Sequence, residues 1–261
     1  MPSVRQPAVA GMFYPDDPRE LRGMVSQYLA AAETAGGVPK AIIAPHAGYI
    51  YSGPVAASAY ALLKAARGAI SRVMLLGPAH RVALSGLALP SSDFFATPLG
   101  DVPIDREAVA ALKNLPQVQV LDAAHAREHS LEVHLPFLQE ALGEFRLVPL
   151  VVGDASAAQV GEVLERLWGG PETLIVISSD LSHYHDYQTA RRMDAATSRA
   201  IESLRFEDLD FDAACGRVPV SGLLYVARQR GLSIRTLDLR NSGDTAGPRD
   251  QVVGYGAYAI N

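Results

Sequence analysis

The chain has 261 residues, of which 49% are hydrophobic and 20% are charged, and its formal net charge is -5. This composition is typical of a globular protein with a substantial core, and the length allows either one large domain or two small ones. No run of Lys or Arg occurs. This argues against a nucleic-acid partner, because binding a phosphate backbone needs clustered cations.

Segments that address a protein to a membrane or to the secretory route are not found. No window approaches the roughly 20 apolar residues that span a bilayer, and the first residues lack the basic and apolar regions of a signal peptide. The single cysteine, Cys215, excludes an internal disulfide and fits a reducing compartment. We therefore expect a cytoplasmic protein with no membrane partner.

Strand-length apolar runs and segments with helical spacing alternate along the chain. The runs that predict strands are 40–45, 72–77, 84–89, 145–152, 173–178, 233–239 and 252–260. The segments that predict helices are 53–66, 156–168, 187–204 and 220–230. Such alternation is typical of right-handed crossovers and of a sheet with a parallel core that helices cover on both faces.

Details of the pattern support one α/β domain over residues 1–261, with a central mixed, largely parallel sheet. The strands at 41–43, 73–76 and 174–177 are apolar throughout, as expected of a sheet buried on both faces. The turn-rich segment 88–105 predicts an inserted meander or edge hairpin. No repeat, low-complexity tract or flexible linker divides the chain.

Three of the buried strands are followed by polar residues that can do chemistry. "KAIIAPH" ends in His46, "RVMLLGPAH" ends in His80, and "TLIVISSDLSHYH" carries Asp180, His183 and His185. In an open α/β sheet the ligand site lies beyond the carboxyl ends of the strands. We therefore expect these side chains to converge in space.

Each of these residues also has a structural interpretation. A single loop histidine is more often a hydrogen-bonded structural residue than a ligand, but the Pro and Gly residues before His46 and His80 favour function, because they stiffen a loop and leave room for a bound group. Asp180 is equally suited to capping the next helix. His183 gains weight from its spacing to Asp180, whereas His185 is interpreted as a neighbour on the other side of the loop.

A fourth cluster, "REHSLEVHLPF", precedes an expected helix and contains Glu128, His129, Glu132 and His134. Its density of ionisable residues favours function over a surface pair, whereas His125 is interpreted as structural or as a surface residue. Imidazoles near carboxylates suit Fe, Cu, Zn or Ni, and an imidazole without metal can serve as acid or base near neutral pH. The residues alone predict a metal site in a strand-end cleft and no particular reaction.

Seven segments occur in an order that resembles a known family: "AVAGMFYP", "APHAGYIYSG", "LLGPAH", "EHSLEVHLPFL", "VISSDLSHY", "CGRVPVSGLL" and "VVGYGAYAI". In them the chain resembles the Memo family, whose name stands for mediator of ErbB2-driven cell motility. Prokaryotic members are called AmmeMemoRadiSam system protein B. The resemblance spans essentially the whole chain and implies a fold similar to class III extradiol dioxygenases of the protocatechuate dioxygenase B-subunit type.

The resemblance also implies roles for particular residues. His46, His80 and Cys215 are the implied metal ligands, with cysteine in place of the dioxygenase carboxylate, although a lone Cys is usually a small buried hydrophobe. The same comparison implies acid–base or ligand-supporting roles for His129, Asp180 and His183. Iron as Fe(2+) is the expected metal, and Cu or Zn are alternatives, because a thiolate softens the site.

Three functions follow as hypotheses. The first is a redox enzyme that uses the metal and dioxygen on a small, possibly catechol-like substrate. The second is a non-catalytic module that binds a peptide or partner in the same cleft, as has been proposed for eukaryotic Memo proteins. The third is a zinc-dependent hydrolase. The name of the prokaryotic members further implies a link to AMMECR-type and radical-SAM proteins.

Overall fold

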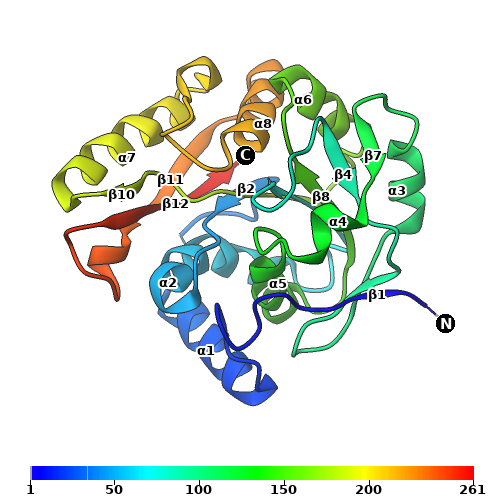
Figure 1. Cartoon of the computed structure of the whole chain (residues 1–261), viewed down its shortest axis with the longest axis horizontal. Helices are drawn as coiled ribbons and strands as arrows, with labels where there is room; N and C mark the ends of the chain where they lie inside the picture. Colours follow the sequence, from blue (N-terminus) through cyan, green and yellow to red (C-terminus); the bar gives the residue numbers. More distant parts are fainter. Residues whose placement is uncertain (1, 34) are drawn as a thin grey trace.

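A nine-stranded mixed sheet runs through the computed structural model, which describes residues 2–33 and 35–261 (Figure 1). Its centre consists of four neighbouring parallel strands, in the order β2 (Ala41–Ala44), β9 (Thr173–Ser178), β3 (Arg72–Pro78) and β8 (Arg146–Val152). Their side chains are almost all buried, because helices cover both faces of the sheet. This burial explains why the strands are apolar throughout.

Antiparallel strands extend the sheet at both edges. Strand β12 (Val252–Ile260) pairs with β2 and also carries β10 (His183–His185) and β11 (Ile234–Asn241). At the other edge β4 (Leu87–Leu89) is antiparallel to β8 and parallel to β7 (Val118–Val120). The predicted α/β fold with a mixed, largely parallel sheet is confirmed.

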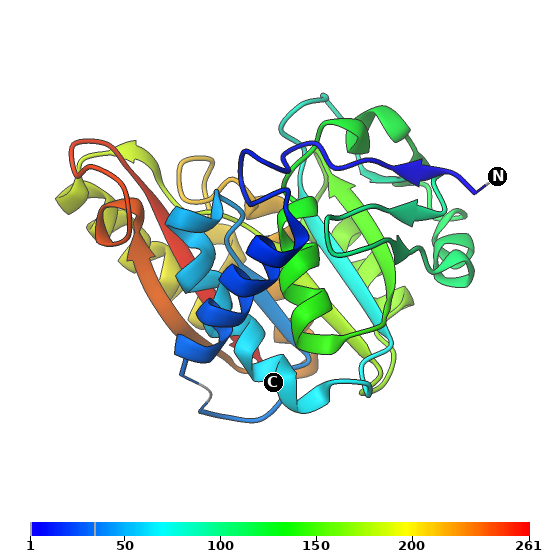
Figure 2. The same cartoon turned by 90° about the horizontal axis from the view of Figure 1, so that it is seen from below.

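Helices lie on both faces of the sheet (Figure 2). On one face are α1 (Pro18–Ala31), α2 (Tyr49–Tyr60) and α5 (Leu135–Leu142). On the other face are α6 (Ala157–Arg166), α7 (Tyr187–Glu202) and α8 (Arg217–Arg230). The shorter helical segments are α3 (Arg106–Leu112), α4 (Asp122–Ala126), η1 (Ala61–Ala66), η2 (Glu132–His134), η3 (Phe206–Asp208) and η4 (Ser242–Asp244). Within the described ranges, no helix has the length and apolarity needed to cross a bilayer.

A small second sheet consists of β1 (Val4–Arg5), β5 (Phe94–Phe95) and β6 (Val102–Pro103). Strands β5 and β6 are antiparallel, which confirms the hairpin predicted within 88–105, and β1 adds to β5 in parallel. The N-terminal segment is thereby tied to a part of the chain far away in sequence.

Helix α1 lies outside the segments for which the sequence analysis predicts a helix. Asp17 caps its first turn, and the buried residues Leu21, Val25 and Leu29 recur every four positions. Its remaining positions are mostly exposed, so the apolar stripe is narrow. The helix is therefore recognisable from its cap and this single stripe rather than from overall apolarity.

Candidate metal centre

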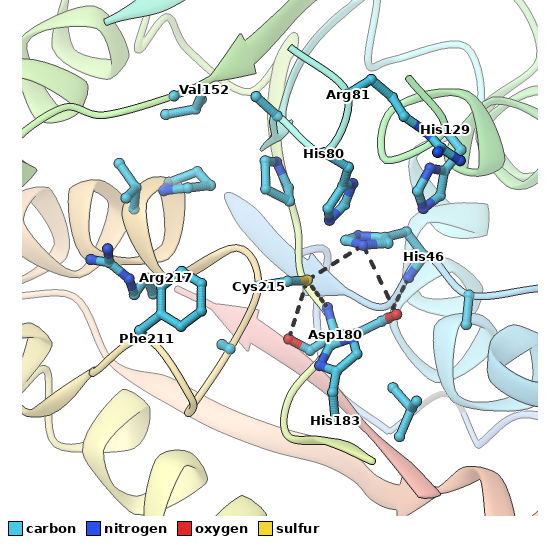
Figure 3. Close-up of a pocket in the computed structure, with 18 of the residues that line it drawn as sticks. His46, His80, Arg81, His129, Val152, Asp180, His183, Phe211, Cys215 and Arg217 are labelled. Carbon is cyan, nitrogen blue, oxygen red and sulfur yellow. Dashed lines mark hydrogen bonds and ion pairs between the residues drawn. The ribbon is translucent and has the colours of Figure 1, made fainter. Parts of the chain in front are cut away.

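A cavity of about 920 Å³ opens beyond the carboxyl ends of β2, β3 and β9 (Figure 3). The six residues implied as ligands or acid–base groups all line it: His46, His80, His129, Asp180, His183 and Cys215. Because β9 lies between β2 and β3, the three parallel strands end at the same edge of the sheet. The convergence predicted for the residues after these strands therefore occurs.

The three implied ligands lie close enough to share one metal ion. The ligand atoms of His46, His80 and Cys215 lie within 4.8 Å of one another, and His46 Nε2 is 3.4 Å from Cys215 Sγ. Nitrogen and sulfur atoms that bind one tetrahedral ion at ordinary bond lengths stand about 3.5 Å apart. The residues present therefore fit a metal ion held by two imidazoles and a thiolate.

Carboxylates hold the two histidine-bearing loops in place. The backbone N–H of His46 donates to Asp180 Oδ1 at 2.8 Å, and the backbone N–H of His80 donates to Glu128 Oε2 at 2.6 Å. Both carboxylates are buried. These bonds fix the main chain at the end of each strand, so each imidazole starts from a defined position.

The thiol reaches the site because helix α8 begins close to the end of β9. Gly216, at the start of this helix, donates its N–H to Ser179 Oγ at 3.0 Å. The backbone N–H of Asp180 in turn donates to Cys215 Sγ at 3.3 Å. This contact between α8 and β9 is a tertiary feature, so the local sequence around Cys215 gives no sign of its position beside the histidines.

Protonation states follow from burial in this part of the molecule. Burial, with smaller contributions from neighbouring histidines, lowers the pKa of His46 well below its ordinary value, so the ring is neutral. Burial also raises the pKa of the Cys215 thiol, and the nearby Asp180 carboxylate adds to this effect. A bound cation supplies the positive charge that a buried thiolate needs.

Glu128 orients His80. Its Oε1 lies 2.9 Å from His80 Nδ1 and accepts the backbone N–H groups of His129 and Ser130, both at 2.9 Å. Burial alone would raise the pKa of Glu128, but the bonds from His80 and from the backbone lower it to about 2. The carboxylate is thus ionised and accepts the His80 Nδ1 proton, which leaves His80 Nε2 free to bind a metal.

A second group with metal-ligand spacing consists of His80, Glu128 and His129. Both oxygens of Glu128 are already occupied by hydrogen bonds, so this carboxylate is better suited to supporting His80 than to binding an ion. The His129 ring stacks on His80 with centroids 4.8 Å apart, and burial lowers its pKa to about 4. His129 therefore borders the site as a neutral imidazole.

Asp180 and His183 lie on the other side of His46 from His129 (Figure 3). Asp180 Oδ2 is 3.9 Å from His46 Nε2, and burial raises the Asp180 pKa despite the opposing effect of His183. The alternative role of Asp180 as a helix cap is wrong, because Asp186 caps α7 with bonds to two backbone N–H groups.

The remaining histidines differ in their surroundings. His185 lines the same cavity as His183. His125 lies in α4, is buried and places Nε2 3.0 Å from the Ala88 carbonyl oxygen, which confirms a structural setting. His134 lies in η2, is buried and does not line the cavity.

Several residues that line the cavity are not among the candidate site residues predicted from the sequence. They are Phe13, Arg81, Tyr184, Phe211 and Arg217. Two signals were available: Arg81 directly follows His80, and Tyr184 separates His183 from His185. Tyr184 also has a positive φ of 61°, which is uncommon for a residue other than Gly.

The chain is similar to known proteins over nearly its whole length. The profile of the Memo-like protein family matches residues 5–259. The chain is 39% identical to a MEMO1 family protein of Aquifex aeolicus, over 97% of both chains, and 37% identical to MEMO1 family protein MK0963 of Methanopyrus kandleri, over 98% of both. The crystal structure of uncharacterized protein JW3007 from Escherichia coli K12 superposes with a TM-score of 0.48 at 14% identity, covering 84% of this chain and 98% of that one. On the family profile and these near-full-length relatives, the chain belongs to the Memo-like protein family.

Proposed function

We propose that the protein binds one metal ion, iron as Fe(2+), through His46, His80 and Cys215. We further propose that it acts with dioxygen as an oxidoreductase on a small, catechol-like substrate. The observation that carries this proposal is the convergence of two imidazoles and a thiol, with ligand atoms within 4.8 Å, beside an open cavity. Bound there, iron or copper would supply redox chemistry toward dioxygen, whereas zinc would supply Lewis acidity.

The surroundings of the ligands support a site with open positions. His46 is buried, whereas the His80 side chain is 27% exposed and borders the cavity. Protein thus covers one side of the ligand set and the cavity lies on the other. A volume of about 920 Å³ lies within the range of about 300–1,000 Å³ that is usual for small-molecule sites.

Side chains around the ligands are suited to moving protons. His129 is neutral and borders the cavity, so it can accept a hydrogen bond from a hydroxyl group of a bound substrate. Asp180 and His183 stand on the other side of His46 and can hold or return a proton there (Figure 3). These assignments give the acid–base work to the chain itself.

A second candidate function rests on the cavity mouth. Phe211 and Tyr184 line the cavity, yet Phe211 is 80% exposed to solvent and Tyr184 is 70% exposed. Large aromatic rings left open to solvent favour contact with another molecule. The alternative is therefore a non-catalytic module that binds a peptide or partner in this cleft.

Further parts of the proposal rest on the sequence. The absence of an internal disulfide partner for Cys215 supports a cytoplasmic location. Membership of the Memo-like family supports a fold similar to class III extradiol dioxygenases and a link to AMMECR-type and radical-SAM proteins.

Metal analysis after anaerobic purification tests the site. We expect about one ion per chain, loss of that ion in His46→Ala and His80→Ala, and weakened binding in Cys215→Ser. His185→Ala is the matched control, because His185 lines the same cavity outside the ligand set. Full metal content in both histidine variants would overturn the ligand assignment.

Oxygen consumption with a panel of catechols tests the reaction on the iron-loaded protein. Uptake that disappears in His129→Ala supports the oxidoreductase. A flat trace across the panel, together with binding of a peptide or partner that Phe211→Ala weakens, supports the module. If the purified protein contains zinc, the zinc-dependent hydrolase would replace both the oxidoreductase and the binding module as the favoured function.

A further inference from the structure

A chain of hydrogen bonds runs from His46 into the core. His46 Nδ1 lies 2.6 Å from Ser178 Oγ, and the same oxygen lies 2.8 Å from His134 Nε2. His134 Nδ1 lies 2.6 Å from the Tyr60 hydroxyl. All four side chains are buried, and of the four only His46 lines the cavity.

The protons of this chain can be assigned by counting donors and acceptors. Ser178 Oγ also lies 2.6 Å from the backbone carbonyl oxygen of Ser130, which can only accept, so the single hydroxyl proton of Ser178 points there. Ser178 Oγ must then accept from both imidazoles, which places protons on His46 Nδ1 and His134 Nε2. His134 Nδ1 is left to accept the proton of the Tyr60 hydroxyl.

This assignment gives every side-chain polar atom of His46, Ser178, His134 and Tyr60 a partner, and it needs only neutral imidazole rings. His134 uses one ring nitrogen as a donor and the other as an acceptor in these bonds, so its ring carries one proton. With its proton on Nδ1, His46 has its lone pair on Nε2. That nitrogen is the one 3.4 Å from Cys215 Sγ.

The packing around the serine leaves room for this arrangement. A Cβ atom on Gly77 would stand 2.8 Å from Ser130 Oγ and 3.1 Å from Ser178 Cβ. Glycine at this position therefore lets the Ser130 segment approach the end of β9. The hydroxyl of Ser130 in turn donates to the Pro78 carbonyl oxygen at 2.9 Å, which ties the same segment to the end of β3.

We infer that Ser178, backed by His134 and Tyr60, is a positioning group that fixes His46 in the tautomer with its lone pair on the metal-facing Nε2. The inference deepens the proposed function and rests on it for the metal. His46 and His80 are then held by different chemistry, a neutral hydroxyl for one and an ionised carboxylate for the other. An imidazole that is hydrogen-bonded to a carboxylate donates its electron pair to a metal more strongly. His80 is therefore the stronger metal ligand of the two, and His46 the weaker.

Nitrogen NMR of the metal-free protein, with ¹⁵N-labelled histidine, tests the tautomer directly. We expect His46 of the unmodified chain to carry its proton on Nδ1, and Ser178→Ala to yield a mixture of tautomers. Ser178→Thr keeps a hydroxyl and should restore the original spectrum. A His46 ring protonated on Nε2 in the unmodified protein would overturn the inference without any variant, so the test survives a variant that fails to fold.

Zinc titration gives a second readout. Ser178→Ala should weaken Zn²⁺ binding about 10–100-fold, the effect usual for removing a group that supports a metal ligand, and Ser178→Thr should recover most of it. Ser198→Ala is the matched control, because it removes another buried hydroxyl, 2.9 Å from Thr236 Oγ1, from a residue that does not line the cavity. Equal affinity for Ser178→Ala and the unmodified chain would overturn the inference. If the unmodified chain binds no ion, the proposed function fails, while the NMR experiment still decides the tautomer.

Discussion

Gly216 packs so closely against Ser178 that a Cβ atom on Gly216 would stand 2.4 Å from the Ser178 carbonyl oxygen. The contact joins the start of α8 to the end of β9. It therefore decides how near Cys215 comes to His46.

Replacing Gly216 with Ala tests this contact. We expect Gly216→Ala to push α8 away from β9, to cost about 1–3 kcal/mol of unfolding free energy, and to weaken Zn²⁺ binding by displacing Cys215. The control is Gly23→Ala in α1, where a Cβ meets no atom within 4 Å. Calorimetric titration and denaturant unfolding measure both effects, and unchanged metal affinity in a folded Gly216→Ala protein would contradict the role of the contact.

Glu128→Gln tests the support of His80. The neutral amide is a weaker hydrogen-bond acceptor for His80 Nδ1 than the carboxylate. The His80 ring is then less firmly oriented and donates its electron pair to a metal less strongly. We expect zinc or iron affinity to fall about tenfold or more while the chain stays folded. Glu162→Gln, whose carboxylate accepts only from Gln117 among the described residues, serves as comparison. Equal metal affinity in both variants would remove Glu128 from the site.

The buried pair of Arg5 and Glu132 holds the N-terminal segment against residues 125–132. Glu132 also accepts the N–H groups of Ala8 and Val9 and the hydroxyl of Tyr14, at 2.7, 3.0 and 2.6 Å. We expect Glu132→Gln to cost about 3–5 kcal/mol of unfolding free energy, because it leaves a buried guanidinium without its counter-charge.

The matched comparison is Glu140→Gln, which breaks an ion pair with a largely exposed Arg22. Surface pairs of this kind contribute about 0–1 kcal/mol. Urea unfolding of both variants measures the difference. Equal losses in the two variants would show that Glu132 does not anchor the segment.

Stability should fall in mild acid because of the buried histidines. Burial lowers the pKa of His134 to about 3 and that of His125 to about 4, whereas both titrate near 6.5 in the unfolded chain. Between these values the unfolded chain binds protons that the folded chain does not, so the unfolding free energy decreases as pH drops below 6.5. Urea unfolding from pH 7.5 to 4.5 measures the slope. His134→Gln should flatten it, and a stability independent of pH over this range would disprove the prediction.

The strands of the sheet were predictable because their local signals agree. Strands β9 and β12 begin and end where the apolar runs 173–178 and 252–260 do, since both runs are long and bounded by turn residues. Strand β1 has only two residues and owes its existence to pairing with β5, a contact between distant segments that no local pattern reports.

The candidate site likewise contains residues that local sequence patterns predict and residues that depend on contacts between distant segments. His46 and His80 were predictable, because each follows a buried strand and parallel strands end at one edge. Cys215 was reached only through resemblance to a family, since its place depends on how α8 docks onto β9. The roles of Ser178 and His134 depend on hydrogen bonds across three separate segments, which a linear sequence does not display.

The order β2–β9–β3 would also link binding of the proposed metal ion to folding. Because β9 separates the strands that carry His46 and His80, these proposed ligands meet only after all three strands have paired, and the unfolded chain holds no preformed site. An ion that binds only the folded chain stabilises it by mass action, by about 2.7 kcal/mol at one hundred times its dissociation constant. The protein's abundance in a cell would then respond to metal supply, with starved molecules unfolding more often and reaching proteases sooner.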